Sequence, residues 1–275
     1  MARLLIGSHC PDYTRDLSIK ATVSNEGEDK QTIMDQMVQQ QLDKWRKLLD
    51  KVLKQGVKIE NFKGGPVITI SREPGAGGSE IARRLSKALN LDLIGGQIIL
   101  HVADSAKMSR KVIQSLDERE VTLRETLLSS LFGENRPWPG EYLQHLTKVV
   151  GTIGAFGNVI MVGRGASYVL PRERTFKVRI IAPIELRIKH FMDDRGYTKA
   201  EAEQYIVKTE NNRKAFVRKY FNADLTDPAH YDMIINTERI SMEGATEAII
   251  VAFSQRRTRQ NPLFQHPAKN EELRV

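Results

Sequence analysis

A glycine-rich segment, Ser71–Ser79, lies between a strand-like pattern and a helix-like pattern. The residues before it, Val67–Ile70, form a short apolar, β-branched run that is typical of a strand buried on both faces. Beyond it, apolar residues fall on one helical face at Ile81, Ala82, Leu85 and Leu89. A buried strand that enters a helix through such a turn predicts an α/β domain.

The glycines of this turn predict an anion site. Gly75, Gly77 and Gly78 let backbone N–H groups converge on one point. The following helix adds unsatisfied donors and the positive end of its dipole, so phosphate is the natural occupant. Ser79 stands where its hydroxyl could cap the helix or reach a phosphate-bound Mg²⁺. The alternative is a plain tight turn with Ser79 as the N-cap.

The turn departs twice from the usual P-loop pattern, G-x-x-x-x-G-K-[ST]. Aligning Gly77 with the second glycine puts Arg72 at the first glycine position and Gly78 at the lysine position. The lysine normally holds a positive charge against the β- and γ-phosphates. If chemistry occurs here, another cation must replace it, and Arg72 is the nearest candidate.

Further strand and helix patterns alternate along the chain, which predicts a parallel sheet with right-handed crossovers. Strand-like runs occupy 159–162, 176–182 and 233–235, and helical patterns occupy 112–127, 185–194, 199–220 and 249–253. The segment 133–140 reads as a loop. We expect a helical extension at 1–64, a main domain at 65–256 and a polar tail at 257–275.

The extension carries an amphipathic helical pattern over residues 31–53. Its apolar stripe could form a homodimer or pack against its own domain.

The net charge of +8 suits a polyanionic partner, although a lysine-rich surface explains it equally well. Among the possible partners nucleic acid ranks last, because basic and aromatic residues do not cluster.

The single cysteine, Cys10, excludes an internal disulfide, and no apolar run is long enough to span a bilayer. We therefore expect a cytoplasmic protein.

Four motifs in one order carry a family resemblance. They are the lysine-free turn with Ile70–Glu73, then Val159–Ala166, Tyr168–Pro171 and Asp227–Thr237. With them the chain resembles the cytidylate kinase-like family, relatives of the bacterial cytidylate kinases, over residues 66 to 253. The resemblance implies a P-loop NTPase-type parallel sheet flanked by helices, with a helical lid. It also implies ATP-dependent phosphoryl transfer to a nucleoside monophosphate, with CMP or dCMP as the default acceptor.

In this resemblance Arg164 matches the arginine of Asp-Gly-Arg-Asp, which helps to hold the monophosphate. A surface ion pair is the alternative role for this side chain. Val162 and Gly165 replace the two acids of that motif, and the second acid contacts the base in cytidylate kinases. This replacement leaves cytosine selectivity open. Gly95 and Gly96 stand where the family carries a polar cluster, which suggests a widened acceptor pocket.

The segment Glu210–Arg213 matches the lid pattern Asp-x-x-Arg. The resemblance places Glu210 near the acceptor ribose and Arg213 on the phosphates, with Lys214 and Arg218 on the same helix face. A solvated helix with ordinary ion pairs is the alternative. Weaker candidates are Arg187 and Lys189 at the lid base, Asp232 before the last strand, and the cluster Asp117–Arg119.

The expected site therefore has two parts. ATP would lie on Arg72, Gly75, Ala76, Gly77, Gly78 and Ser79, with Mg²⁺ held by Ser79, phosphates and water. The acceptor would lie on Arg164, Glu210 and Arg213, and the catalytic cations would be Arg72, Arg164, Arg213 and Arg218. The alternative function is a nucleotide-binding regulatory module with little or no kinase turnover.

Overall fold

The computed structural model describes residues 32–44 except 34, residue 47, residues 64–96, 98, 99 and 102, and residues 141–260. The helix expected at 112–127, the loop at 133–140 and the cluster Asp117–Arg119 lie outside the described residues. Most of the expected tail lies outside them too. No helix among the described residues is long and apolar enough to cross a membrane.

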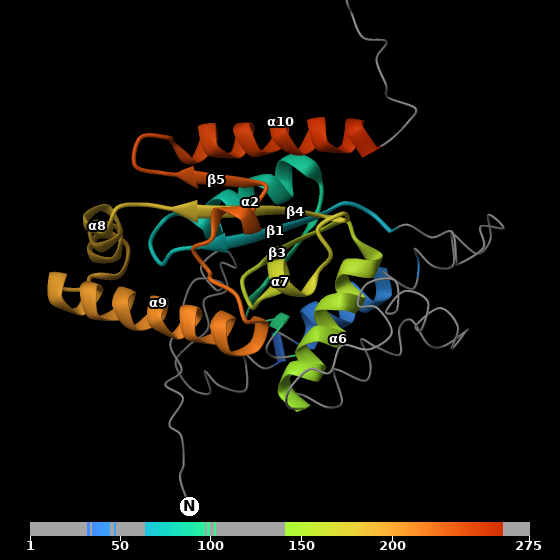
Figure 1. Cartoon of the computed structure of the whole chain (residues 1–275), viewed down its shortest axis with the longest axis horizontal. Helices are drawn as coiled ribbons and strands as arrows, with labels where there is room; N and C mark the ends of the chain where they lie inside the picture. Colours follow the sequence, from blue (N-terminus) through green and yellow to red (C-terminus); the bar gives the residue numbers. More distant parts are fainter. Residues whose placement is uncertain are drawn as a thin grey trace, which may run out of the picture.

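Five parallel strands form one sheet in the order β2-β3-β1-β4-β5 (Figure 1). Their bounds are β1 Val67–Arg72, β2 Asp92–Gly95, β3 Val159–Val162, β4 Thr175–Ile181 and β5 Met233–Asn236. The four strand-like runs in the sequence are confirmed as β1, β3, β4 and β5. The edge strand β2 was not predicted.

Helices cover both faces of the sheet. They are α2 Gly78–Leu89, α6 Glu141–Phe156, α7 Ala166–Val169, α8 Ile184–Arg195, α9 Lys199–Phe221, the 3-10 turn η2 Pro228–His230, and α10 Met242–Gln260. Helices α2, α8, α9 and α10 are confirmed predictions, whereas α6 and α7 were not predicted. The last helix continues beyond residue 256, the expected end of the main domain.

The two faces have separate apolar cores. Helices α2 and α10 pack on one face, around Ile68, Ile70 and Val178. On the other face lie α6, α7 and the helical residues from 32 to 44, around Val67, Val159 and Met161. Figure 1 shows this three-layer arrangement, with α10 and α2 above the sheet and α6 below it.

Part of the N-terminal extension packs on its own domain. Val38 and Leu42 are 4% and 1% exposed and belong to the core beside α6. The side chains of Gln41 and Lys44 also donate to the carboxylate of Asp92 at the start of β2. Leu42 of the predicted stripe thus packs on its own domain, whereas Ile33 and Met37 are half-buried, and a homodimer through the extension stays a prediction.

Helices α8 and α9 form an arm with its own small core, built on Ile188, Phe191, Ala202 and Ile206. Gly196, with φ of 67°, ends α8 in the left-handed region. Thr198 and Glu201 then form a capping box that starts α9. The arm is the helical lid of the predicted fold.

Strand β1 lies between β3 and β4, so the chain leaves β1 toward one edge of the sheet and later returns to its other side. In such a sheet, a ligand crevice opens beyond the carboxyl ends of the strands where the order reverses. The pairing of Ile70 with Val162 puts the segments after β1 and β3 at this same edge. These segments carry the glycine turn and Arg164.

Candidate active site

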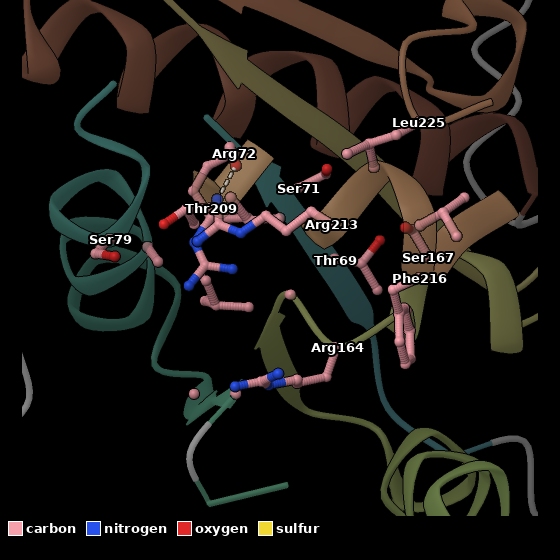
Figure 2. Close-up of a pocket in the computed structure, with 18 of the residues that line it drawn as sticks. Thr69, Ser71, Arg72, Ser79, Arg164, Ser167, Thr209, Arg213, Phe216 and Leu225 are labelled. Carbon is pink, nitrogen blue, oxygen red and sulfur yellow. Dashed lines mark hydrogen bonds between the residues drawn. The ribbon is translucent and has the colours of Figure 1, made fainter. Parts of the chain in front are cut away.

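A cavity of about 720 Å³ opens at this edge of the sheet (Figure 2). Its walls come from the end of β1, the first turns of α2, the end of β2, the segment after β3, and α9. It brings together Arg72, Ser79, Arg164 and Arg213 from the predicted site. Glu210, Arg218 and the glycines of the turn are not among its lining residues.

The glycine turn has the backbone geometry of an anion site. Gly75 and Gly77 have φ of 79° and 77°, in the region that glycine adopts readily. Gly77 is the N-cap of α2 and has no side chain that could accept from the first amides of this helix. The amide of Glu80 donates to the Gly77 carbonyl at 3.0 Å, and the amides of Gly78 and Ser79, before it, stand where a helix amino end binds anions.

The carbonyl groups of the turn are used to anchor it. His190 Nδ1 lies 2.7 Å from the carbonyl oxygen of Gly75. The hydroxyl of Thr237 donates to the carbonyl of Ala76 at 3.1 Å. Because neighbouring elements satisfy these carbonyls, the turn is held before any ligand arrives.

Glu73 fastens the turn to β4 and α8. Its carboxylate accepts from the backbone N–H of Ala182 at 3.1 Å and lies 3.4 Å from Arg179 Nη2. Arg187 Nε lies 3.6 Å from the same carboxylate. Both arginines are buried, so Glu73 offsets two charges that would otherwise be costly in the interior.

Arg72 occupies the space that a side chain at position 78 would need. A Cβ atom added to Gly78 would lie 2.6 Å from the Cβ and 3.1 Å from the Cγ of Arg72. Real Cβ atoms do not approach another carbon to 2.6 Å, so a side chain at position 78 clashes while residue 72 carries a Cβ atom, as every residue except glycine does. The two departures from the P-loop pattern are thus coupled by packing.

The guanidinium of Arg72 lies over Gly163, where an added Cβ would overlap Arg72 Nη1. Gly163 has φ of 78°, and Arg164 follows it with φ of 52°. An added Cβ on Gly96 would lie 3.0 Å from the Cγ of Arg164. The glycine at position 96 thus makes room for the Arg164 side chain, besides lining the cavity.

Arg213 reaches the glycine turn from α9. Its Nη1 donates to the backbone carbonyl of Arg72 at 2.7 Å, the dashed line in Figure 2. Glu210, one turn earlier on α9, pairs with Arg187 Nη1 at 2.5 Å. It lies at a smaller cavity next to the main one, together with Glu73 and Lys214. These two contacts dock α9 on the turn and on α8.

Arg218 is exposed on α9, outside both cavities. It lies near Asp224, whose pKa is lowered first by hydrogen bonds from Thr226 and further by the charges of Lys214 and Arg218. The predicted catalytic role of Arg218 therefore has less geometric support than the roles of Arg72, Arg164 and Arg213.

Arg83 is a fourth arginine of the main cavity and was not predicted. It stands on α2 and forms an ion pair with Glu80. A signal was present in the sequence, because Arg83 follows Ser79 by four residues and so shares its helix face. The described lining residues include four arginines, Arg72, Arg83, Arg164 and Arg213, and no carboxylate.

The opposite end of the cavity is uncharged and rich in hydroxyl groups. Thr69, Ser167 and Tyr168 line it together with Phe216. Burial raises the pKa of Tyr168, and its hydrogen bond with Tyr231 raises it further, so the phenol stays protonated at neutral pH.

Two titratable groups lie behind this wall, outside the cavity lining. Burial lowers the pKa of Lys177 on β4, although the charge of Asp232 partly opposes this shift. Burial also lowers the pKa of His230, which stacks on Tyr168 with ring centroids 4.2 Å apart. The carboxylate of Asp232 accepts from the backbone N–H of Lys177 at 2.8 Å and so shapes the strand pairing instead of lining the cavity.

The described residues contain no group of three or more His, Cys, Asp or Glu side chains that could hold a metal ion. Ser79 lines the cavity beside the amino end of α2. This donor set fits Mg²⁺ that is held mainly by phosphate oxygens and water with one hydroxyl ligand.

The sheet order, the glycine turn that enters α2 and the arginine-lined cavity together define the P-loop class of phosphate-binding domains. A family model described as the cytidylate kinase-like family matches residues 67–239. The chain belongs to the cytidylate kinase-like family and is a phosphotransferase.

Named relatives agree with this assignment. A cytidylate kinase of Methanopyrus kandleri is 25% identical over 211 residues, which are 73% of this chain and all of that protein. A cytidylate kinase of Staphylothermus marinus is 22% identical over 178 residues, 64% of this chain and 90% of that protein. Among solved structures, an uncharacterized protein from Eubacterium ventriosum matches with a TM-score of 0.49 and 20% identity, over 69% of this chain and 98% of that one.

Proposed function

We propose that this protein is a nucleoside monophosphate kinase that transfers the γ-phosphoryl group of ATP to CMP, dCMP or a related monophosphate. The observation that carries the proposal is the meeting of Arg72, Arg164 and Arg213 at one cavity beside the glycine turn. These arginines come from three segments far apart in the sequence. Phosphoryl transfer needs positioning and charge neutralisation above all, and guanidinium groups supply both.

The donor would lie on the glycine turn. The amides at the start of α2 would hold its phosphates, and Arg72 would supply the charge that the P-loop lysine supplies elsewhere. The stem of Arg72 fills the space in front of Gly78, which is the position aligned with that lysine. We therefore infer that the two departures from the P-loop pattern compensate for each other. The cation that a P-loop carries at the start of the helix, at position 78, stands here at the end of β1, at position 72.

The acceptor would lie across the cavity. Arg164, at the carboxyl end of β3, would grip its phosphate, and Arg213 would contact the group in transfer. The contact of Arg213 with the Arg72 carbonyl keeps it at the cavity. The ribose role predicted for Glu210 would require its ion pair with Arg187 to open. Arg218 would assist only from the rim of the lid.

The charge of the cavity suits this pair of ligands. ATP and a monophosphate together carry about six negative charges near neutral pH, and one Mg²⁺ offsets two of them. Four arginines and no carboxylate line the described part of the cavity. Mg²⁺, when bound at Ser79, would neutralise phosphate charge and orient the donor.

The test is a panel of nucleoside monophosphates, each incubated with the full chain, ATP and Mg²⁺ while ADP release is followed. We expect turnover with CMP or dCMP that depends on both Mg²⁺ and the acceptor. Tight ATP binding without transfer to any acceptor would contradict the proposal and favour the nucleotide-binding regulatory module.

A further inference from the structure

The main cavity has two ends of different chemistry. Figure 2 shows Ser79 on one side, Ser167 and Phe216 on the other, and Arg213 and Arg164 between them. The phosphates belong at the side with the arginines and the glycine turn. A nucleoside attached to the acceptor phosphate would then extend toward the uncharged end, where aromatic rings and hydroxyls line the wall.

At this end Thr69 carries a hydroxyl without a partner. Thr69 lies in the central strand β1, is 1% exposed, and lines the cavity. Its Oγ1 atom is buried and makes no hydrogen bond with any described residue. A buried polar atom without a partner is costly, and a ligand that pairs with it recovers that cost. Ser167, 6% exposed, lines the same wall.

Gly165 stands where the resemblance puts the acid that contacts the base in cytidylate kinases, and the ring of Phe221 lies against it. A Cβ atom added to Gly165 would lie 2.7 Å from Cε2 and 2.8 Å from Cζ of Phe221. Gly165 has φ of 71°, in the left-handed region that glycine adopts most readily. The ring of Phe221 thus occupies the space that a side chain at this position would need. The described lining offers no other carboxylate.

A hydroxyl and a carboxylate select bases differently. An ionised carboxylate only accepts hydrogen bonds, so it favours the amino group of cytosine over the carbonyl oxygen of uracil. A hydroxyl rotates and can either accept from that amino group or donate to that carbonyl. A wall of hydroxyls therefore binds both pyrimidines.

We propose that Thr69 and Ser167 form the subsite for the base edge of the acceptor, and that this subsite takes uracil as well as cytosine. The inference rests on the proposed function, because it assumes that the acceptor phosphate lies on Arg164. The substrates are then pyrimidine nucleoside monophosphates, and the site does not discriminate between the amino group of cytosine and the carbonyl oxygen of uracil.

Two measurements test the subsite. Calorimetry gives the Kd of CMP and UMP for the full chain, and initial rates with ATP and Mg²⁺ give kcat/KM for both. We expect UMP to lie within about tenfold of CMP in each measurement, since a rotated hydroxyl replaces one hydrogen bond by another. A preference for CMP above about a hundredfold would overturn the proposal.

Two single substitutions test whether the hydroxyls of Thr69 and Ser167 bind the base. Thr69→Val keeps the shape and removes the hydroxyl, and Ser167→Ala does the same at the second position. Each should raise the Kd of CMP and of UMP about tenfold and leave the Kd of ATP unchanged. Thr152→Val is the matched control, because Thr152 on α6 is also fully buried with an unpartnered hydroxyl but does not line the cavity.

Unchanged Kd values for both pyrimidines in Thr69→Val and Ser167→Ala would overturn the subsite. That failure is separate from failure of the proposed function, which would appear as absence of transfer to every acceptor. Because the Kd measurements need no turnover, the subsite is tested even in a protein that transfers nothing.

Discussion

The cavity takes its cations from two kinds of element. Arg72 and Arg164 follow the neighbouring strands β1 and β3, whereas Arg213 stands on the lid helix α9. The strand ends are held by backbone pairing, with Gly163 N–H donating to Ile70 and Glu73 N–H donating to Ile180, each at 3.0 Å.

Helix α9 contacts the turn through Arg213 and the Arg72 carbonyl, and it contacts α8 through the Glu210–Arg187 pair and the apolar core of the arm. This difference between the strand ends and the lid helix indicates which part of the site is already formed before a ligand binds. The sheet side is a fixed platform, whereas the contact between α9 and the turn is a polar contact that an incoming phosphate could replace. Changes on the sheet side should therefore have larger effects than changes on the lid side.

The largest effect is expected from Arg72→Gly. If Arg72 supplies the charge of the P-loop lysine, as proposed, its loss should lower kcat/KM about a thousandfold, or about 4 kcal/mol of transition-state stabilisation. ADP release with saturating acceptor measures it. Lys87→Ala, which removes an exposed charge at the end of α2, serves as the control. A loss below about threefold for Arg72→Gly would refute the platform role of this arginine.

The next largest effect is expected from Arg164→Ala. This change should lower kcat/KM for the acceptor about a hundredfold, because a charge-assisted contact with its phosphate is lost. The Kd of ATP should change by less than about threefold. Steady-state kinetics with varied acceptor, together with ATP calorimetry, separate the two. Equal losses for donor and acceptor in a folded variant would show that Arg164 does not act on the acceptor.

Glu73→Gln should disturb the platform itself. The change removes the charge that faces the buried Arg179 and Arg187, and we expect the free energy of unfolding to fall by about 2 kcal/mol. Urea unfolding measures this loss, with the exposed Glu185→Gln as the control on α8. If Glu73→Gln unfolds at the same urea concentration as the parent chain, the turn is not anchored through this carboxylate.

The smallest effect is expected on the lid side, from Glu210→Gln. Arg187 is buried but keeps the carboxylate of Glu73 3.6 Å from its Nε, so the loss of the Glu210 charge should lower the free energy of unfolding by only about 1 kcal/mol. Amide hydrogen exchange in α9 should nevertheless quicken, since the lid loses one of its fastenings. Glu203→Gln, exposed on the same helix, is the control. Unchanged exchange in α9 would mean that other contacts hold the lid.

Most of the sheet could be predicted from the sequence, because β1, β3, β4 and β5 are continuous apolar runs. Strand β2 escaped prediction because it begins with Asp92, ends with Gly95 and has only two apolar residues between them. Helix α6 has apolar residues at helical spacing, but Gly151 and Gly154 interrupt its pattern and a proline-rich segment precedes it.

The site could be predicted in part. The glycine turn, Arg72 and Ser79 follow from the strand-to-helix pattern, and the resemblance singled out Arg164 and Arg213. Pairing between elements could not be predicted, because nothing in one sequence shows that Glu210 meets Arg187 on another helix. Thr69 escaped for a different reason: a threonine in a buried strand reads as ordinary core.

The central claim is that Arg72 supplies the charge of the P-loop lysine, and that Gly78 stands at the lysine position because the Arg72 side chain fills the space there. The double variant Arg72→Gly/Gly78→Lys restores the usual pattern and removes the clash that a side chain at position 78 meets. Measured as kcat/KM beside both single variants, the double variant should recover at least about tenfold over Arg72→Gly, and Gly78→Lys alone should lose activity. A double variant no more active than Arg72→Gly would contradict the claim.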